Sequence, residues 1–236
     1  MKDHSKIYGV STGPGNPELL TLKAVRIIKE ADIIAYPVDR SGKSVALSIA
    51  GQAVDINGKE LLGLFFPMTR DDSELNEAWN EISNTVSERL RNGRTIAFLS
   101  LGDVSLYSTW GYLRSKMKEL GFETETVPGV TAMSDVAAKL DRDLSSGDEN
   151  LIVIPASVSD DELDALLDLK GSKVIMKAGR SLNLIIEKLK KRDLLQDSAM
   201  IINCGLPGEK IYRDLENADD AKGYFATILI KKESEK

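Results

Sequence analysis

Short apolar runs alternate with amphipathic stretches along this chain. Residues 7–10 form an apolar run that predicts a strand, and residues 17–30 carry leucine, valine and isoleucine near helical spacing, which predicts a helix. The further predicted strands are 33–36, 61–66, 95–99, 123–127, 151–154, 173–176, 199–203 and 224–230. The further predicted helices are 44–53, 71–92, 105–120, 131–139, 160–169 and 182–191. Strands that alternate with helices predict an α/β protein with mainly parallel sheets covered by helices.

The chain divides most naturally where this alternation restarts, between Gly121 and Pro128. We therefore expect two α/β domains, residues 1–122 and residues 123–236. Its length of 236 residues suits two small domains and leaves ample sequence for hydrophobic cores.

Composition narrows the classes of function. The net charge of −6 argues against binding nucleic acid through a basic surface. The single cysteine, Cys204, excludes an internal disulfide and any multi-cysteine metal site, and the only histidine, His4, lies in a polar N-terminal segment. We thus expect no metal centre and no histidine-based catalytic triad. No apolar stretch approaches the roughly 20 residues of a membrane span, and the N-terminus lacks the apolar core of a secretion signal, so we expect no membrane partner and a cytoplasmic protein.

The most informative segment is the turn Gly13-Pro14-Gly15-Asn16 between the first predicted strand and helix. Glycines let a ligand approach the main chain closely. The turn lacks both the Gly-Lys-Ser/Thr ending of a P-loop and the glycine spacing of a dinucleotide site. It is interpreted either as a ligand-binding turn or as a tight strand-to-helix connection.

Two more loops follow the same strand–turn–helix plan. Asp103 follows the strand 95–99, where it can bind a ligand hydroxyl or amine or cap the next helix, and Tyr107 can stack on a ligand ring or fill the core. Thr131 follows the turn Pro128-Gly129 and can cap a helix. Ligands of open α/β sheets bind beyond the carboxyl ends of strands, so three such loops together favour a binding site.

The second half offers weaker candidates. Lys177 and Arg180 follow the strand 173–176, where they are either solvated or in contact with an anionic ligand. Cys204 precedes Gly205 at another strand end, and we expect a buried thiol there because no histidine is available to activate it.

With these loops in place, the chain resembles the tetrapyrrole methylases, which are S-adenosylmethionine-dependent enzymes of cobalamin and sirohaem biosynthesis. The segments that carry the resemblance are GVSTGPGNPELLTLKAVRIIKEADIIAYP (residues 9–37), LSLGDVSLYSTWGYL (99–113) and VPGVTAMSDVAAKL (127–140). Together they are far more specific than any one of them alone.

Finer features are similar to the branch that methylates C20 of precorrin-2 or cobalt-factor II. They are Tyr36-Pro37, Phe66-Pro67-Met68 before a helix with Trp79, and Tyr107-Ser108-Thr109. Two positions depart from the pattern of many relatives, which have Asp in place of Asn16 and Pro in place of Val104.

The resemblance implies a homodimer in which the methyl donor, S-adenosylmethionine, lies in a cleft between two α/β domains. By position, the expected donor contacts are Leu101, Gly102, Asp103, Val104, Tyr107, Thr131, Ala132, Met176, Lys177, Ala178, Gly205 and Ala226. The expected tetrapyrrole contacts are Gly13, Pro14, Gly15 and Asn16. Asp103 is the candidate for catalytic proton transfer, and loop position suggests Arg70, Arg142, Lys177 and Arg180 as partners for the substrate's carboxylates.

Other readings remain open. The nearest are methylation of uroporphyrinogen III, methylation of a different precorrin position, and a methylase of the diphthamide pathway. A different class is a non-catalytic metabolite binder that reuses the fold, which would bind the donor without methylating any acceptor.

Overall fold

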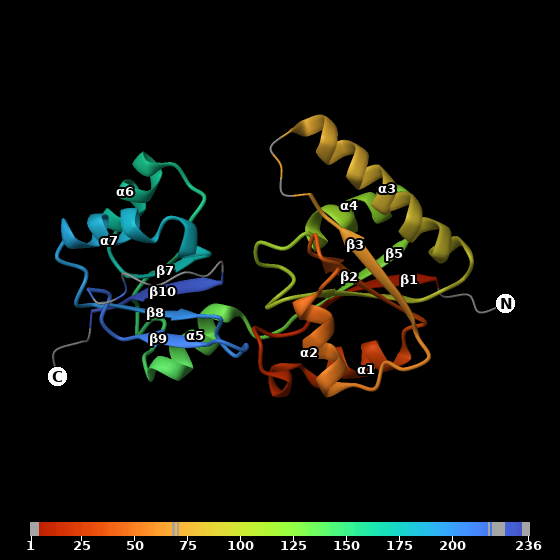
Figure 1. Cartoon of the computed structure of the whole chain (residues 1–236), viewed down its shortest axis with the longest axis horizontal. Helices are drawn as coiled ribbons and strands as arrows, with labels where there is room; N and C mark the ends of the chain where they lie inside the picture. Colours follow the sequence, from red (N-terminus) through yellow and green to blue (C-terminus); the bar gives the residue numbers. More distant parts are fainter. Residues whose placement is uncertain (1–4, 68, 70, 217, 219–224, 233–236) are drawn as a thin grey trace. The chain divides into compact units, whose positions relative to one another are not determined.

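The computed structural model describes residues 5–67, 69, 71–216, 218 and 225–232. The chain forms two compact units, Met1–Thr131 and Ala132–Lys236 (Figure 1), and each is described by itself.

The first unit is built on a five-stranded sheet with the order β3-β2-β4-β1-β5. Its strands are β1 (Lys6–Ser11), β2 (Ile33–Val38), β3 (Glu60–Phe65), β4 (Ile96–Ser100) and β5 (Glu123–Val127). Its helices are the 3-10 turn η1 (Pro17–Leu19), α1 (Leu22–Glu30), α2 (Val45–Ala53), α3 (Asp72–Arg91) and α4 (Trp110–Glu119). All neighbouring strands are parallel, so their carboxyl ends meet at one edge, as the sequence predicts.

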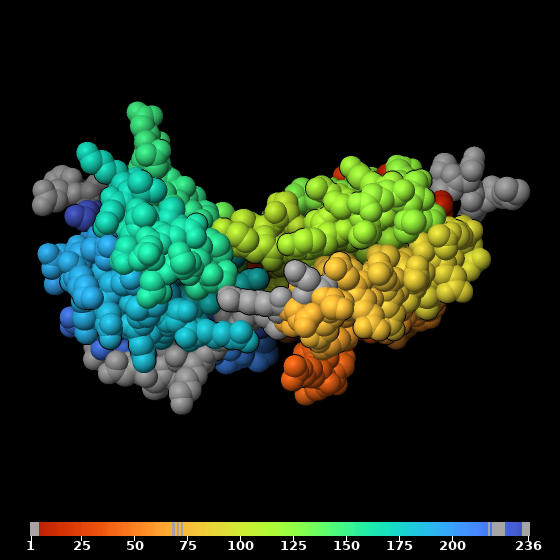
Figure 2. Space-filling model, turned by 90° about the horizontal axis from the view of Figure 1, so that it is seen from above, coloured from red at the N-terminus to blue at the C-terminus, as the bar shows by residue number. Residues whose placement is uncertain are grey.

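Helices α1 and α2 cover one face of this sheet, and α3 and α4 cover the other (Figure 1). The two helices α3 and α4 also lie side by side at the surface in the space-filling view (Figure 2). The core beneath them centres on Trp110 of α4, which is 1% exposed and stacks on Phe98 of β4. A Cβ atom on Gly9 of β1 would lie 2.3 Å from the Trp110 ring, so α4 packs directly on the main chain of β1.

The boundary between the units differs from the sequence prediction. The sequence pattern places the strand at residues 123–127 in the second domain, but β5 pairs along β1 from Lys6 opposite Glu123 to Val10 opposite Val127. The first unit therefore ends after Thr131 rather than after residue 122. Parallel pairing joins strands far apart in the chain, and local patterns do not reveal it.

Two predicted helices begin later than expected. The segment 17–30 divides into η1 and α1, and the Thr21 hydroxyl caps α1 by accepting from the Ala24 amide at 3.1 Å. The helix predicted from residue 105 starts only at Trp110, because residues 101–109 form a loop.

The second unit has a mixed sheet with the order β6-β7-β10-β8-β9. Its strands are β6 (Leu151–Pro155), β7 (Ser172–Met176), β8 (Ser198–Ile202), β9 (Lys210–Tyr212) and β10 (Ala226–Ile230). Its helices are α5 (Ala132–Leu140), α6 (Asp160–Asp168), η2 (Ala178–Arg180) and α7 (Leu182–Lys190).

The pairing of β6 with β7 is parallel, whereas β10 runs antiparallel to β7 and β8, and β8 runs antiparallel to β9. The expectation of mainly parallel strands thus holds for the first sheet and not for the second. Residues 203–209 between β8 and β9 are too short for the crossover of about a dozen residues that parallel pairing needs. None of the helices in the described ranges combines the length and apolar character of a bilayer span.

Candidate active site

The loops that follow β1 and β4 are joined through their main chains. The Gly102 amide donates to the Gly13 carbonyl at 2.8 Å, and the Gly13 amide donates to the Gly102 carbonyl at 3.2 Å. Both residues have positive φ, 71° and 73°, which glycine adopts without steric cost. Two of the three predicted loops therefore meet at the carboxyl edge of the first sheet.

Ser11 connects the third loop, which follows β5, to the loop that follows β4. Its buried hydroxyl donates to the Val127 carbonyl at 2.8 Å and accepts from the Val104 amide at 2.9 Å. A Cβ atom on Gly129 would lie 2.3 Å from the Ser11 Cβ, so only glycine fits there. Ser11 is not among the predicted site residues, and its one signal in the sequence is a small polar residue at the end of an apolar strand.

Asp103 holds the same loops from the other side. The residue is 7% exposed, and its Oδ1 atom accepts from the Ser105 amide at 2.8 Å and from the Ser105 hydroxyl. Oδ2 accepts from the Gly129 amide at 2.7 Å. Burial alone would raise the pKa of Asp103, but the hydrogen bonds from Ser105 and Gly129 outweigh it and lower that pKa. The helix cap that the sequence suggests for Asp103 is wrong, because α4 begins only at Trp110. Asp103 instead closes a turn on Ser105, and its carboxylate ties the β4 loop to the β5 loop.

A cavity of about 440 Å³ opens beside this loop. Its lining is Val104, Ser105, Tyr107, Ser108, Thr109, Trp110, Gly111, Tyr112, Arg114 and Thr126. Tyr107 is 44% exposed, so it does not fill the core, and its φ of 50° is unusual for a residue with a side chain. Partial burial raises the pKa of Tyr107, which keeps its hydroxyl protonated. The Ser108 hydroxyl fixes the start of α4 by accepting from the Trp110 amide at 3.0 Å.

The second unit gathers its predicted donor contacts at one edge of its sheet. Met176 ends β7 opposite Thr227, and Ala226 begins β10 opposite Ile202 at the end of β8. The neighbours of these strand ends have positive φ: Lys177 at 60° and Gly205 at 74°. Gly205 adopts this angle freely, whereas Lys177 is strained, and strained backbone of this kind clusters at functional sites.

The predicted site residues thus form two groups, one in each unit. The first contains Gly13, Pro14, Gly15, Asn16, Leu101, Gly102, Asp103, Val104, Tyr107 and Thr131. The second contains Ala132, Met176, Lys177, Ala178, Gly205 and Ala226. Thr131 and Ala132 are adjacent at the junction of the units.

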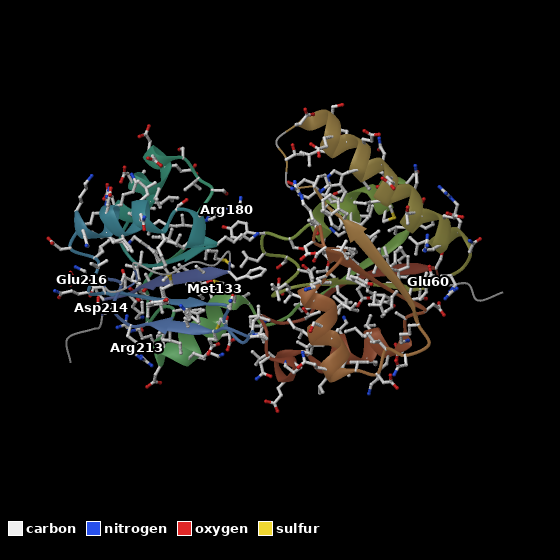
Figure 3. The ribbon with its side chains drawn as sticks, viewed as in Figure 1. Glu60, Met133, Arg180, Arg213, Asp214 and Glu216 are labelled. Carbon is white, nitrogen blue, oxygen red and sulfur yellow. The ribbon has the colours of Figure 1, made fainter. Side chains whose placement is uncertain are left out.

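The predicted polar and cationic contact residues lie in different local surroundings. The Asn16 side chain caps η1 by accepting from the Glu18 amide at 3.0 Å. Arg142 Nη1 donates to the Asp197 carbonyl at 3.3 Å, which gives it a structural contact. Arg180 lies in η2 after β7 and is labelled in Figure 3. Arg70 lies outside the described residues.

Cys204 is the buried thiol that the sequence predicts. Burial and a hydrogen bond from Sγ to Asp135 Oδ2 at 3.2 Å raise the pKa of the Cys204 thiol, which makes this thiol a poor nucleophile.

Across the described ranges, no group of three or more His, Cys, Asp or Glu side chains converges so as to hold a metal ion.

Known proteins are similar to this chain in sequence and in fold. The family model for tetrapyrrole (corrin/porphyrin) methylases matches residues 6–218. The cobalt-precorrin-2 C(20)-methyltransferase of Salmonella typhimurium is 34% identical and covers 98% of both chains. The probable cobalt-precorrin-2 C(20)-methyltransferase of Methanocaldococcus jannaschii is 36% identical and covers 96% of both.

Solved structures agree on the fold. A cobalt precorrin-4 methyltransferase superposes with a TM-score of 0.78 at 23% identity, covering 98% of this chain and 96% of the other. The uroporphyrin-III C-methyl transferase of Thermus thermophilus in complex with S-adenyl homocysteine gives a TM-score of 0.67 at 21% identity, covering 95% and 96%. Given the family match over most of its length and these near-complete relatives, the chain belongs to the tetrapyrrole methylase family.

Proposed function

We propose that the protein is an S-adenosylmethionine-dependent methyltransferase that methylates C20 of precorrin-2 or of its cobalt form in cobalamin biosynthesis. The observation that carries this proposal is the similarity, over almost the whole chain, to relatives named for that reaction. The hydrogen-bonded loops at the carboxyl edge of the first sheet support this proposal, because their main chains are held together in a fixed arrangement that a bound donor can contact.

When bound, the donor supplies a sulfonium-activated methyl group: the carbon–sulfur bond breaks, its electron pair goes to sulfur, and a bond forms to the acceptor carbon, which then loses a proton. The protein's part is alignment and exclusion of water. We assign donor contacts to Leu101–Val104 and Tyr107 in the first unit, and to Met176–Ala178, Gly205 and Ala226 in the second. Thr131 and Ala132 complete the set.

For Asp103 the hydrogen bonds favour a positioning role over proton transfer. Both of its oxygens already accept from Ser105 and Gly129, and a lowered pKa makes a carboxylate a weaker base. We therefore propose that Asp103 sets the loop that receives the donor. Proton removal from the acceptor carbon is left to solvent or to another group.

For the tetrapyrrole we propose the Gly13–Asn16 turn together with the cavity beside Tyr107. The rings of Tyr107 and Tyr112 offer flat apolar surface to a macrocycle, and Arg114 on the same cavity offers a bidentate partner for a peripheral carboxylate. Of the residues that line this cavity, the sequence predicts only Val104 and Tyr107 as site residues.

The decisive experiment offers precorrin-2 and cobalt-factor II side by side, without oxygen, to the protein and donor carrying a ¹³C-labelled methyl group. We expect one added methyl per acceptor, with its carbon resonance at C20. Methylation at another position or only of uroporphyrinogen III would support a different methylase, and donor binding without any methylated acceptor would support the metabolite binder.

We further propose a homodimer that uses the open edge of the first sheet. Edge strand β3 leaves Leu61 and Phe65 each 46% exposed on the face opposite its buried Leu64. Gly63 lies between Leu61 and Phe65 on this face, and the half-buried side chains of Tyr36 and Val38 from β2 pack over it. Apolar side chains exposed along an edge strand favour association with a second copy.

A further inference from the structure

One face of α5 holds the loop that follows β8. Asp135 and Lys139 are four residues apart on that helix, so their side chains lie on the same face. Asp135 accepts the hydrogen bond from the Cys204 thiol, and Lys139 forms an ion pair with Glu209. The first and the last part of the loop are therefore both tied to one helix.

Glu209 also reaches back across its own loop. Its Oε2 atom accepts from the Gly205 amide at 2.6 Å, in addition to the ion pair with Lys139. The loop turns tightly, with positive φ at Asn203 (52°) and Gly205 (74°), and the Leu206 amide donates to the Asn203 carbonyl at 2.8 Å. Glycine and asparagine both adopt the left-handed region readily, so the residue types of this loop favour the turn.

The charges of this cluster are consistent with the hydrogen bonds. Burial alone would raise the pKa of Glu209, but the bonds from Gly205 and Lys139 outweigh it, so its pKa is lowered. Burial alone would lower the pKa of Lys139, but the bond to Glu209 outweighs it and raises that pKa. Both groups are ionised near neutral pH, and the thiol of Cys204 is protonated and serves as a donor.

We propose that Glu209 is a positioning residue for the methyl donor: it orients the peptide between Cys204 and Gly205, while Lys139 and Asp135 hold Glu209 and the loop against α5. This inference rests on the proposed function, in which Gly205 contacts the donor. Because a trans peptide is planar, fixing the Gly205 amide toward Glu209 points the Cys204 carbonyl the opposite way. A loop held in this way binds without first losing conformational freedom.

Three changes at Glu209 separate the bond to Gly205 from the ion pair. Glu209→Ala removes both, Glu209→Gln keeps an oxygen acceptor for the amide, and the exchange Lys139→Glu with Glu209→Lys keeps opposite charges but removes the acceptor. The full chain is titrated with S-adenosylhomocysteine by calorimetry, and its Tm, KM for the donor and kcat are measured.

We expect Glu209→Ala and the charge exchange to raise Kd and the donor KM about tenfold, the equivalent of one hydrogen bond, with kcat at saturating donor within about twofold. Glu209→Gln should recover most of the affinity. The matched control is Asp164→Ala, which breaks the 2.6 Å ion pair with Lys188 between α6 and α7 of the same unit and should leave Kd unchanged.

Wild-type affinity in Glu209→Ala, or its rescue by the charge exchange, would overturn the inference. So would an equal loss of affinity in Asp164→Ala, since that would reflect general stability. If the wild-type chain itself bound no S-adenosylhomocysteine, the proposed function would fail as well, whereas a normal wild-type result with an unaffected Glu209→Ala would reject this inference alone.

Discussion

At the scale of single residues, Asp103 and Asp39 make the same local motif in different surroundings. Each carboxylate accepts from the amide and the hydroxyl of the serine two residues later, Ser105 and Ser41 respectively. Only Asp103 adds a long-range bond, to the Gly129 amide. Asp39 lies in an exposed turn. Replacing each aspartate in turn therefore distinguishes the loss of the local motif from the loss of its contact within the site.

We predict that Asp103→Ala weakens the binding of S-adenosylhomocysteine by about 1–3 kcal/mol, because the Ser105 and Gly129 amides lose the acceptor that orders the loop. Calorimetric titration measures the change. Asp39→Ala should bind the ligand as the wild type does. Unchanged affinity in Asp103→Ala would remove this residue from the donor site.

At the scale of elements, the contact between β1 and α4 sets how closely the helix approaches the sheet. Gly9 leaves room for the Trp110 ring, and Trp110 Nε1 donates to the Thr126 hydroxyl at 2.9 Å. That bond joins α4 to β5, so one tryptophan connects the helix to two strands. The loop from residue 101 to 109, which carries Asp103 and Tyr107, ends at this helix.

We predict that Gly9→Ala destabilises the protein by about 1–3 kcal/mol or more, because its Cβ would overlap the buried indole. Gly111, the residue that follows Trp110 in α4, is the control: a Cβ there meets nothing within 4 Å. Gly111→Ala should be neutral or stabilising by up to about 1 kcal/mol, since alanine favours helix. Urea unfolding gives both values, and equal midpoints for the two variants would contradict this account of the packing.

At the scale of the whole molecule, the proposed homodimer has the exposed face of β3 as its interface. If a second copy covers it, the protein should elute with a mass near twice the chain's 25.9 kDa. The double variant Leu61→Glu and Phe65→Glu should be monomeric, because an interface between two copies would then bury carboxylates of like charge without cationic partners.

Light scattering coupled to gel filtration measures both masses. Leu22→Lys is the control: Leu22 is 89% exposed at the start of α1, away from β3, and its replacement should leave the mass unchanged. A wild-type monomer, or a double variant that still forms the dimer, would show that this face is not the interface.

Much of this protein is determined by the sequence itself. The alternation of apolar runs and amphipathic stretches predicts most strands and helices, because burial of one face repeats over neighbouring residues. The three loops carry enough distinctive residues to indicate the family.

Tertiary structure alone decided how these pieces join. The pairing of β5 with β1, and the bond from Ser11 to the Val127 carbonyl, link residues more than 110 positions apart, which no local pattern encodes. The antiparallel pairings of β10 and the hydrogen bond from the Gly205 amide to Glu209 likewise depend on which backbone groups find partners in the folded chain. Buried polar groups must be hydrogen-bonded, and only the folded chain shows which partners satisfy them.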